Sequence, residues 1–425
     1  MGSTLPPFGS PQVQRTNVLR ALLSNANAGM TSALAARTVM TTPPTVTANG
    51  TNAPAGNTRA YNWNTYPSNF RQFGGTPLMS SSGIRRFQAL TVNPTGGNIG
   101  NSANPGASGD VWRVEMMVDA VAPSFRVGVV TSTSPYRFIV NDQYVSLTGT
   151  PTVSSSGSYE YITLDFTNAG GRAVRKITVE GMANGGFDGC YVGPTESVSA
   201  CAEGNLLNGV GLGDSYMQGA DGTHYGDGLF MRMADYLGIR NFMASGSGGT
   251  GWQTAPTTYR FGDRIANGDL SLNGTPDIIF LMGSYNDRNA ATQAAIQTPA
   301  LAGMQAARSQ FPNALIVVIG AYPGSTGPSA GILQAEAAMQ AAFAQFADSF
   351  SVFVPISPPG FPQGYMVFGT GNTGAPAGNG NADLWIDSGG VHFNNAGCGF
   401  GGYAMANRVI AAVVARFGTA PTVIV

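Results

Sequence analysis

The chain has 425 residues, of which 21 are basic and 22 acidic, and a formal net charge of −1. This balance gives no basic surface for nucleic acid or for an anionic membrane. Charged residues make up 10% of the chain and hydrophobic residues 43%, whereas an average soluble protein is about 25% charged. We therefore expect folded domains whose surfaces carry hydroxyls and amides, a composition common in extracellular β-rich proteins and phage appendages.

Residues 1–60 are expected to form an N-terminal arm or linker that is partly helical. Apolar residues recur at helical spacing between Gln12 and Val39, and a stretch rich in Thr, Pro, Asn and Gly follows from Thr41 to Asn57. The arm could attach the protein to a larger assembly, pack on a domain or remain a tail. No run of about 20 uninterrupted apolar residues is present, so we expect no membrane span. The N-terminus lacks the pattern of a secretory signal.

Residues 61–200 are expected to form an all-β sandwich. Short segments of strand-like alternation, separated by turns, lie at 111–119, 125–130, 136–140, 159–166 and 173–180. Their order, with phrases such as Phe138-Ile-Val-Asn-Asp-Gln-Tyr-Val and Arg175-Lys-Ile-Thr-Val-Glu, resembles the jelly-roll modules that precede the catalytic domain in some carbohydrate esterases. The resemblance implies a carbohydrate-binding module as one role for this region.

Residues 201–425 alternate between strand and helix. Apolar runs predict strands at 210–212, 241–244, 276–282, 314–320 and 351–356, and helical spacing predicts helices at 228–237, 290–310, 329–350 and 395–417. Continuous apolar strands between helices indicate an α/β domain with a parallel sheet covered on both faces. In such sheets the functional site lies at the carboxyl ends of the strands.

Four polar segments occupy positions that this rule brings to one rim. They are Gly213-Asp-Ser-Tyr216 after the first strand, the glycine-rich stretch 245–252 after the second, Gly283-Ser-Tyr-Asn-Asp287 after the third, and Asp387-Ser-Gly-Gly-Val-His392 before the last helix. The chain has only two histidines. A serine nucleophile needs a base that is half-neutral near pH 7, which is the chemistry of imidazole. The pairing of Ser215 with His392 is therefore our central hypothesis.

Taken together, the four segments resemble the SGNH (GDSL-type) hydrolases over about residues 205–417. The resemblance implies a flavodoxin-like three-layer α/β/α domain with esterase, lipase, acetylesterase or thioesterase activity and no cofactor. It implies Ser215 as nucleophile and His392 as base. The oxyanion would be held by the N–H groups of Ser215 and Gly248 and by the side chain of Asn286. Another glycine of 246–251 could take the place of Gly248.

Two positions depart from the family pattern. Ser284 stands where the third block usually has glycine, and Gly389 stands where the last block usually has the aspartate three residues before histidine. Asp387, five residues before His392, is predicted to complete the triad, with Asp383 or a backbone carbonyl as the alternatives. Asn286 could instead only cap the helix that follows.

Other residues near the predicted rim have two interpretations. Aromatic rings could stack on a sugar or pack in the core; we predict substrate contact for Tyr216, Trp252 and Tyr285, and Trp385 lies nearby. Asp214 is expected to fix the turn before the nucleophile. His224 is expected in a surface loop. Cys190 and Cys201 could form a disulfide, although separate buried thiols are the simpler expectation.

These observations predict a serine ester hydrolase that removes O-acyl groups, foremost O-acetyl groups, from a carbohydrate or polysaccharide. It is expected to act outside the cell or on a virion, with no metal, no nucleic acid and no membrane span. One alternative is a lipase or thioesterase acting on small acyl esters. The other is a viral or surface binding protein with a degenerate hydrolase domain.

Overall fold

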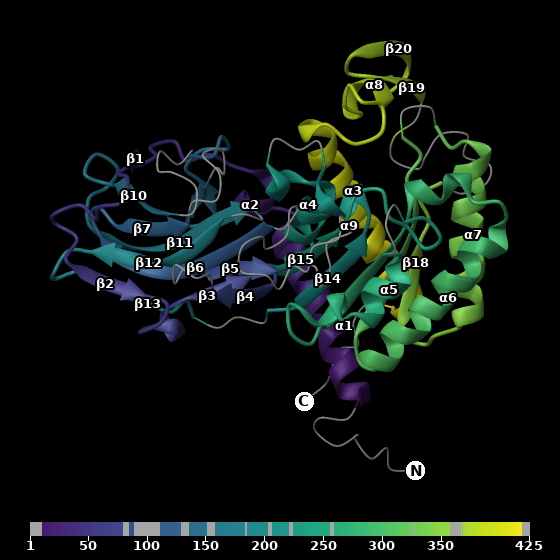
Figure 1. The fold of residues 1–425 in the computed structure, drawn as a ribbon, viewed down its shortest axis with the longest axis horizontal. Helices are drawn as coiled ribbons and strands as arrows, with labels where there is room; N and C mark the ends of the chain where they lie inside the picture. Colours follow the sequence, from purple (N-terminus) through teal and green to yellow (C-terminus); the bar gives the residue numbers. More distant parts are fainter. Residues whose placement is uncertain are drawn as a thin grey trace. The chain divides into compact units, whose positions relative to one another are not determined.

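The computed structural model describes residues 11–418, apart from 80–84, 89–110, 129–135, 151–157, 183–184, 203–205, 221–223, 256–258, 325–326, 358–366 and 368. The chain divides into two compact units (Figure 1). The first is formed from residues between 32 and 204, and the second from residues after 205 together with the N-terminal helix α1 (Pro11–Gly29).

The first unit is a sandwich of two antiparallel sheets, which confirms the predicted fold class of this region. One sheet has the order β1-β10-β7-β12-β5-β4, with β2 also paired to β12, and the other has the order β13-β6-β11-β8-β9, with β3 paired to β6. The strands are β1 (Thr45–Ala48), β2 (Arg59–Asn62), β3 (Arg71–Phe73), β4 (Thr76–Met79), β5 (Arg85–Gln88), β6 (Val111–Ala120), β7 (Ser124–Gly128), β8 (Arg137–Val140), β9 (Gln143–Tyr144), β10 (Tyr159–Asp165), β11 (Ala173–Met182), β12 (Gly186–Val192) and β13 (Ser197–Ser199). The predicted strand 125–130 ends at Gly128, and residues 129 and 130 lie outside the described part of the chain.

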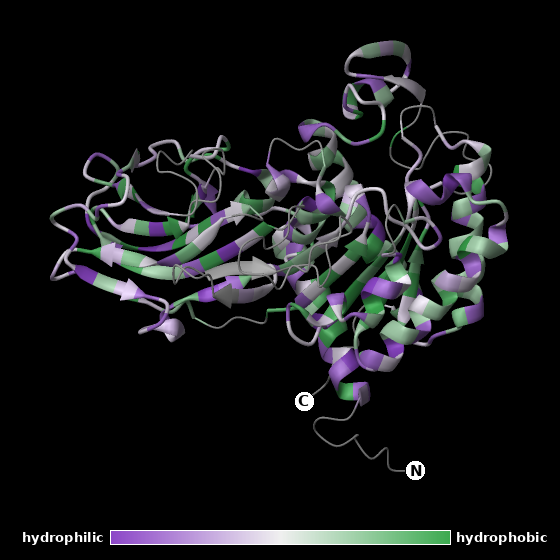
Figure 2. Ribbon diagram, in the orientation of Figure 1, coloured by the Kyte–Doolittle hydropathy of each residue, from purple (hydrophilic) through white to green (hydrophobic). Residues whose placement is uncertain are grey.

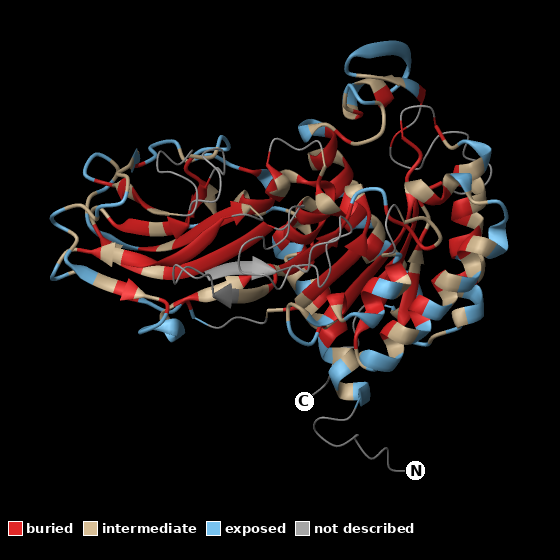
Figure 3. Ribbon diagram, in the orientation of Figure 1, coloured by how far each residue is buried: buried red, intermediate tan, exposed pale blue. Residues whose placement is uncertain are grey.

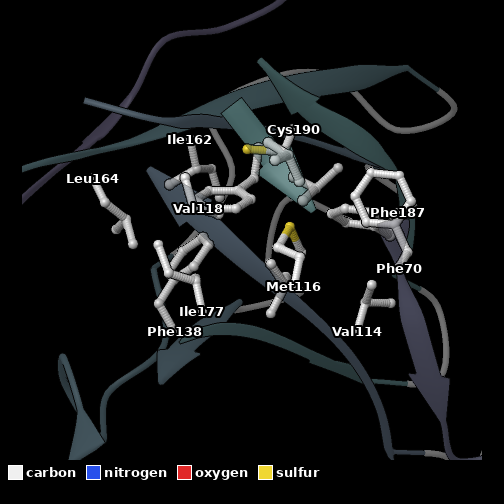
Figure 4. Close-up of a cluster of buried hydrophobic side chains, with 14 of the residues drawn as sticks. Phe70, Val114, Met116, Val118, Phe138, Ile162, Leu164, Ile177, Phe187 and Cys190 are labelled. Atoms are coloured by element: carbon white, nitrogen blue, oxygen red, sulfur yellow. The ribbon is translucent and has the colours of Figure 1, made fainter. Parts of the chain in front are cut away.

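Alternation along the strands sends apolar side chains of both sheets into one core. The side chains labelled in Figure 4 are Phe70, Val114, Met116, Val118, Phe138, Ile162, Leu164, Ile177, Phe187 and Cys190. On the opposite face of β6 and β11, charged residues are buried as well. Glu180 lies in register with Arg113 on β6 and with Arg137 on β8. Its carboxylate accepts hydrogen bonds from Arg113 Nε at 2.8 Å and Arg137 Nε at 2.7 Å.

Residues 11–60 are divided between the two units, and packing on a domain was one of the alternatives for this region. Helix α1 packs with the second unit because its apolar side, including Leu22, is buried there, and Arg15 Nη2 donates to Pro312 O at 2.7 Å. A one-turn helix, α2 (Ala33–Ala36), follows, and β1 and β2 then join the sandwich. Both placements have a simple physical reason: Thr-rich extended segments can pair as edge strands, and an amphipathic helix buries its apolar side wherever a surface fits it.

The second unit is built on a parallel five-stranded sheet in the order β15-β14-β16-β17-β18. This is the flavodoxin-like order 2-1-3-4-5, as predicted. Its strands are β14 (Asn208–Gly213), β15 (Asn241–Gly246), β16 (Ile278–Gly283), β17 (Leu315–Ala321) and β18 (Ser351–Val354). Every residue of β16 and β17 is buried (Figure 3), and the sheet is strongly apolar (Figure 2), which is what coverage on both faces requires.

Two groups of helices flank this sheet (Figure 1): α1, α4 and α9 contact one another, and α6 contacts both α5 and α7. Their bounds are α4 (Leu229–Tyr236), α5 (Phe261–Ala266), α6 (Gln293–Gln310), α7 (Ala330–Phe346) and α9 (Asn395–Phe417). The shorter elements are α3 (Ser215–Gln218), η2 (Tyr225–Asp227), η3 (Asp269–Ser271), η4 (Tyr285–Asn289), the hairpin β19 (Gly369–Asn372) and β20 (Ala375–Gly380), and α8 (Ala382–Trp385), with η1 (Pro67–Asn69) in the sandwich.

Helix α9 has the bounds predicted from the sequence. By length and composition it could cross a membrane, and it is the one such helix among the described residues. It packs against α4 and β18, however, and buries eight of its residues, among them Met405 and Val409. Those contacts are the ones that a core helix of an α/β domain makes.

Candidate active site

The first predicted segment forms a tight turn from β14 into α3. Asp214 is the N-cap residue, and Ser215 is the first residue of the helix. Gly213 is required at the end of β14, because a Cβ there would lie 2.1 Å from Met282 Sδ. At a helix start the backbone N–H of Ser215 has no acceptor within the helix. The half-exposed serine therefore presents a hydroxyl and an N–H group at the carboxyl end of the sheet.

His392 meets Ser215 directly. His392 Nε2 lies 2.7 Å from Ser215 Oγ, across 177 residues of sequence. The histidine is held in a turn before α9, in which Asp387 N donates to His392 O at 2.8 Å and Ile386 forms an antiparallel bridge with Phe393. The structure thus brings together the two side chains that the sequence paired.

Asp387 lies beside His392 and contacts its backbone. Asp387 Oδ1 accepts from the main-chain N–H of His392 at 3.2 Å. Asp383, the alternative partner, is a half-buried residue of α8. The role of Asp387 in orienting the imidazole remains a prediction.

Tyr216 is not placed to stack on a substrate, which corrects our expectation for it. Its side chain is 3% exposed. The ring stacks on Tyr322 at a centroid distance of 4.8 Å and meets the edge of the His392 ring at 5.1 Å, while its hydroxyl donates to Val391 O. Because Tyr216 follows Ser215 within α3, the turn of the helix directs its ring into the core. Tyr216 therefore supports the segment that carries the histidine.

The carboxylate of Asp214 holds the first and third segments together. It accepts from Tyr216 N at 3.0 Å, Ser284 Oγ at 2.8 Å, Tyr285 N at 3.1 Å and Asn286 Nδ2 at 3.3 Å. Burial raises the pKa of Asp214 to about 6, against the lowering effect of these hydrogen bonds and of nearby His392. The turn-fixing role expected for this residue extends to the loop that carries Asn286. Ser284, noted in the sequence only as a departure from the family pattern, supplies one of the links.

Asp287 plays the same part for the glycine-rich loop. Its buried carboxylate accepts from the backbone N–H groups of Trp252, Gln253 and Thr254 at 2.8, 3.1 and 2.9 Å. Burial raises the pKa of Asp287, and these three bonds oppose the rise. The sequence marked Asp287 as part of the third segment without assigning it this function.

Trp252 is also a core residue, contrary to its predicted contact with substrate. It is fully buried, and its Nε1 donates to Met282 O at 3.0 Å. Of the predicted aromatic contacts, Tyr285 is half-exposed, with the guanidinium of Arg288 over its ring at 3.9 Å. Trp385 is half-buried and stacks on Phe400. Nearness to a motif in the sequence does not show whether an aromatic ring points into the core or towards solvent.

Two of the three predicted oxyanion donors are already engaged with protein acceptors. Gly248 stands next to Ser215, since a Cβ on it would lie 3.7 Å from Ser215 Cβ. Its N–H donates to Gln218 Oε1 at 2.9 Å. Asn286 Nδ2 donates to Thr250 O at 3.0 Å and to Asp214. No capping bond from the Asn286 side chain accompanies the helix start at Gln293, where Thr292 is the N-cap residue.

Arg264 is a positioning residue that the sequence did not reveal. Its buried guanidinium donates to Gly213 O at 2.8 Å, to Ser245 O at 2.6 Å and to Asp269 Oδ2 at 2.9 Å. It therefore ties the end of β14 to the end of β15, the two strands that lead to Ser215 and Gly248. One arginine in a weakly amphipathic segment gives no sequence signal for such a role.

The remaining expectations have mixed outcomes. His224 is 2% exposed rather than on the surface, because its Nδ1 accepts from Gly226 N at 3.0 Å and caps η2. Cys190 and Cys201 are buried thiols that are not joined by a disulfide. Among the residues that the structure describes, no group of three or more His, Cys, Asp or Glu side chains is arranged to hold a metal ion.

Comparison with known proteins agrees with this fold. Residues 212–399 match the model of the GDSL-like lipase/acylhydrolase family. No curated protein matches the chain.

Solved structures share the fold over most of the chain. A family two carbohydrate esterase from Cellvibrio japonicus aligns with a TM-score of 0.57 and 12% identity, over 87% of this chain and 98% of that chain. The acetyl xylan esterase Est2A from the rumen bacterium Butyrivibrio proteoclasticus aligns with 0.53 and 10%, over 89% and 99%. The salicylyl-acyltransferase SsfX3 from a tetracycline biosynthetic pathway aligns with 0.58 and 13%, over 84% and 98%. At such identities the likeness shows the fold alone.

The match to the GDSL-like lipase/acylhydrolase family lies in the second unit and spans the segments from the Ser215 turn to the His392 turn. The protein is accordingly a carboxylic ester hydrolase that carries an N-terminal β-sandwich unit.

Proposed function

We propose that this protein removes O-acetyl groups from a carbohydrate or polysaccharide, acting outside the cell, with Ser215 as nucleophile. The observation that carries the proposal is the 2.7 Å contact between Ser215 Oγ and His392 Nε2 beside the N–H groups of Ser215 and Gly248. The low-charge surface suits a neutral, hydroxyl-rich substrate, and the carbohydrate esterases among the structures of the same fold support this choice.

In the proposed mechanism Ser215 Oγ attacks the acyl carbon while His392 Nε2 takes its proton. The negative charge that forms on the carbonyl oxygen is held by the N–H groups of Ser215 and Gly248, with the amide of Asn286 as third donor. His392 then gives the proton to the departing sugar hydroxyl. Water, activated by the same imidazole, cleaves the acyl-enzyme to acetate and restores Ser215.

We further propose that Asp387 orients His392. Its support is the position of the carboxylate at the base of the histidine turn, where it accepts from the His392 N–H. Asp387→Asn should lower kcat by at least about 100-fold, since the corresponding change in other triads is at least that costly. Asp383→Asn is the matched control. A larger loss for Asp383→Asn would transfer the orienting role to that residue.

The direct test is acetate release from p-nitrophenyl acetate and from acetylated polysaccharides. Ser215→Ala should abolish turnover while the protein keeps its melting temperature. Ser388→Ala, a change of an exposed serine close to the histidine in sequence, should keep wild-type turnover. Wild-type activity in Ser215→Ala would refute the assignment.

Substrate class is tested by acyl length and by acceptor. A steep preference for acetyl over butyryl and longer esters supports a sugar O-acetyl substrate, whereas preference for long chains would favour the lipase or thioesterase alternative. Because one structure of the same fold is named as an acyltransferase, free sugars should be offered together with water. Acyl transfer to a sugar in preference to water would overturn the hydrolytic assignment.

A further inference from the structure

The side chain of Gln218 is bound to the Gly248 N–H group, which the proposed reaction needs as a free hydrogen-bond donor. Gln218 is the last residue of α3, three positions after Ser215, so both side chains project from neighbouring positions of one helical turn. Gln218 Oε1 accepts from Gly248 N at 2.9 Å. A Cβ on Gly248 would lie 3.1 Å from that oxygen and 3.7 Å from Ser215 Cβ. Nucleophile, donor and carboxamide thus share one small space.

The backbone of Gln218 is held firmly, whereas its side chain has freedom to move. Gly246, at the end of β15, packs so closely that a Cβ on it would lie 2.0 Å from Gln218 N. The Gln218 residue itself is half-exposed. Rotation about its side-chain bonds can therefore release Gly248 N–H without moving α3 or β15.

The carboxamide oxygen is chemically equivalent to the group that must replace it. An amide C=O and an ester C=O are both neutral, planar acceptors that take one N–H bond. An ester carbonyl beside Ser215 and Gln218 Oε1 would compete for the same Gly248 N–H. Productive binding of the ester then requires the Gln218 carboxamide to move away from the Gly248 N–H group.

We propose that Gln218 is an intramolecular plug of the oxyanion hole, which an ester substrate displaces before acylation. This inference rests on the proposed function of Ser215 and Gly248. A net hydrogen bond of about 0.5–1.5 kcal/mol must be broken on binding. The plug therefore lowers kcat/KM by roughly 2- to 10-fold and leaves kcat unchanged, because the bound state is open in all cases.

The test is a set of three substitutions with steady-state kinetics on p-nitrophenyl acetate. Gln218→Met keeps the length of the side chain and removes the strong acceptor, so kcat/KM should rise roughly 2- to 10-fold. Gln218→Ala should give a rise of the same size. Gln218→Glu places a charged acceptor on the donor, so kcat/KM should fall at pH 8 and recover towards pH 5 relative to the Met variant. Gln293→Met, a change on exposed α6, is the control and should have no effect.

A second readout is the second-order rate of labelling by a fluorophosphonate, which should rise in Gln218→Met by the same factor as kcat/KM. Unchanged or lowered kcat/KM in both the Met and Ala variants would contradict the proposal that Gln218 blocks the Gly248 N–H group. A lowered value would mean that Gln218 contacts the substrate. Failure of the proposed function is distinguishable: there Ser215→Ala would retain turnover. If Ser215→Ala is inactive and Gln218→Met matches the wild type, only the plug is refuted.

Discussion

The two units bury charged side chains in different ways. In the sandwich, Glu180 is paired with Arg113 and Arg137 across neighbouring strands of one sheet. In the hydrolase unit, the buried carboxylates of Asp214, Asp287 and Glu336 accept backbone N–H groups from segments at the ends of the strands. At Asp214 the side chains of Ser284 and Asn286 donate as well. The buried pair of Arg264 with Asp269 also acts on strand ends, through the carbonyl groups that Arg264 binds. The first arrangement joins strands, and the second shapes loops.

This contrast explains where function can arise. Glu180 and its arginine partners neutralise one another within a single sheet, so replacing Glu180 should affect stability alone. A carboxylate that gathers N–H groups from several loops fixes the positions of those loops at the rim of the sheet. Substitution there should affect catalysis more than folding.

The largest expected effect is on stability, in Glu180→Gln. This change leaves two buried guanidinium groups without their shared carboxylate, and breaking a buried pair typically costs about 3–5 kcal/mol. Urea unfolding should show that loss, while esterase activity well below the transition remains at the wild-type level. Asp119→Asn, in the exposed pair with Arg172, is the control and should leave unfolding unchanged. Loss of esterase activity in folded Glu180→Gln would contradict the proposed difference between the two units.

The next effect is a pH dependence at Asp214. Its pKa is raised from 3.8 to about 6 in the folded protein. The folded state therefore binds this proton more tightly, and the associated stability is complete below pH 4 and lost as the pH rises through 6. The unfolding free energy of the wild type, minus that of Asp214→Asn, should fall by roughly 3 kcal/mol between pH 3 and 8. A difference that is flat or rises over this range would contradict the account.

A smaller effect is expected for Asp287→Asn, which replaces an acceptor of three N–H bonds by a group that carries donors of its own. The loop with Gly248 should shift, and kcat should fall by about 100-fold, as displacements of about 1 Å at a site can cause. Asp188→Asn changes a buried aspartate of the sandwich, paired with Arg126, and should leave kcat intact. Equal losses of kcat in Asp287→Asn and Asp188→Asn would show that the shape of the loop with Gly248 is not the cause of the loss.

The smallest effect is expected for Tyr216→Phe. It removes the hydrogen bond to Val391 O and keeps the ring packing against Tyr322 and His392. A net bond of about 1 kcal/mol predicts a roughly fivefold decrease in kcat, with little change in KM. A rise in KM with kcat unchanged would instead indicate that Tyr216 contacts the substrate.

The sequence predicted those features that depend on periodicity and order along the chain. Helix α9, the strand order of the hydrolase unit and the meeting of Ser215 with His392 all follow from apolar runs and from the rule that sites lie at strand ends. The sandwich followed from alternation with frequent turns.

Features that depend on the direction of a side chain were not predictable in this way. Tyr216 and Trp252 lie near motifs, yet both point into the core. Arg264 and Gln218 act through backbone atoms 19 to 51 residues away, a relation without any local signature. Docking of α1 on the hydrolase unit likewise depends on a surface that exists only after folding.

The central claim, that His392 activates Ser215, is tested most directly by covalent labelling. The wild type treated with a fluorophosphonate should gain one adduct in its intact mass, and peptide mapping should place the adduct on Ser215. His392→Asn should lose this labelling, whereas His224→Asn, the matched change at the only other histidine, should retain it. An adduct on a different residue, or equal labelling rates in the wild type and His392→Asn, would contradict the account.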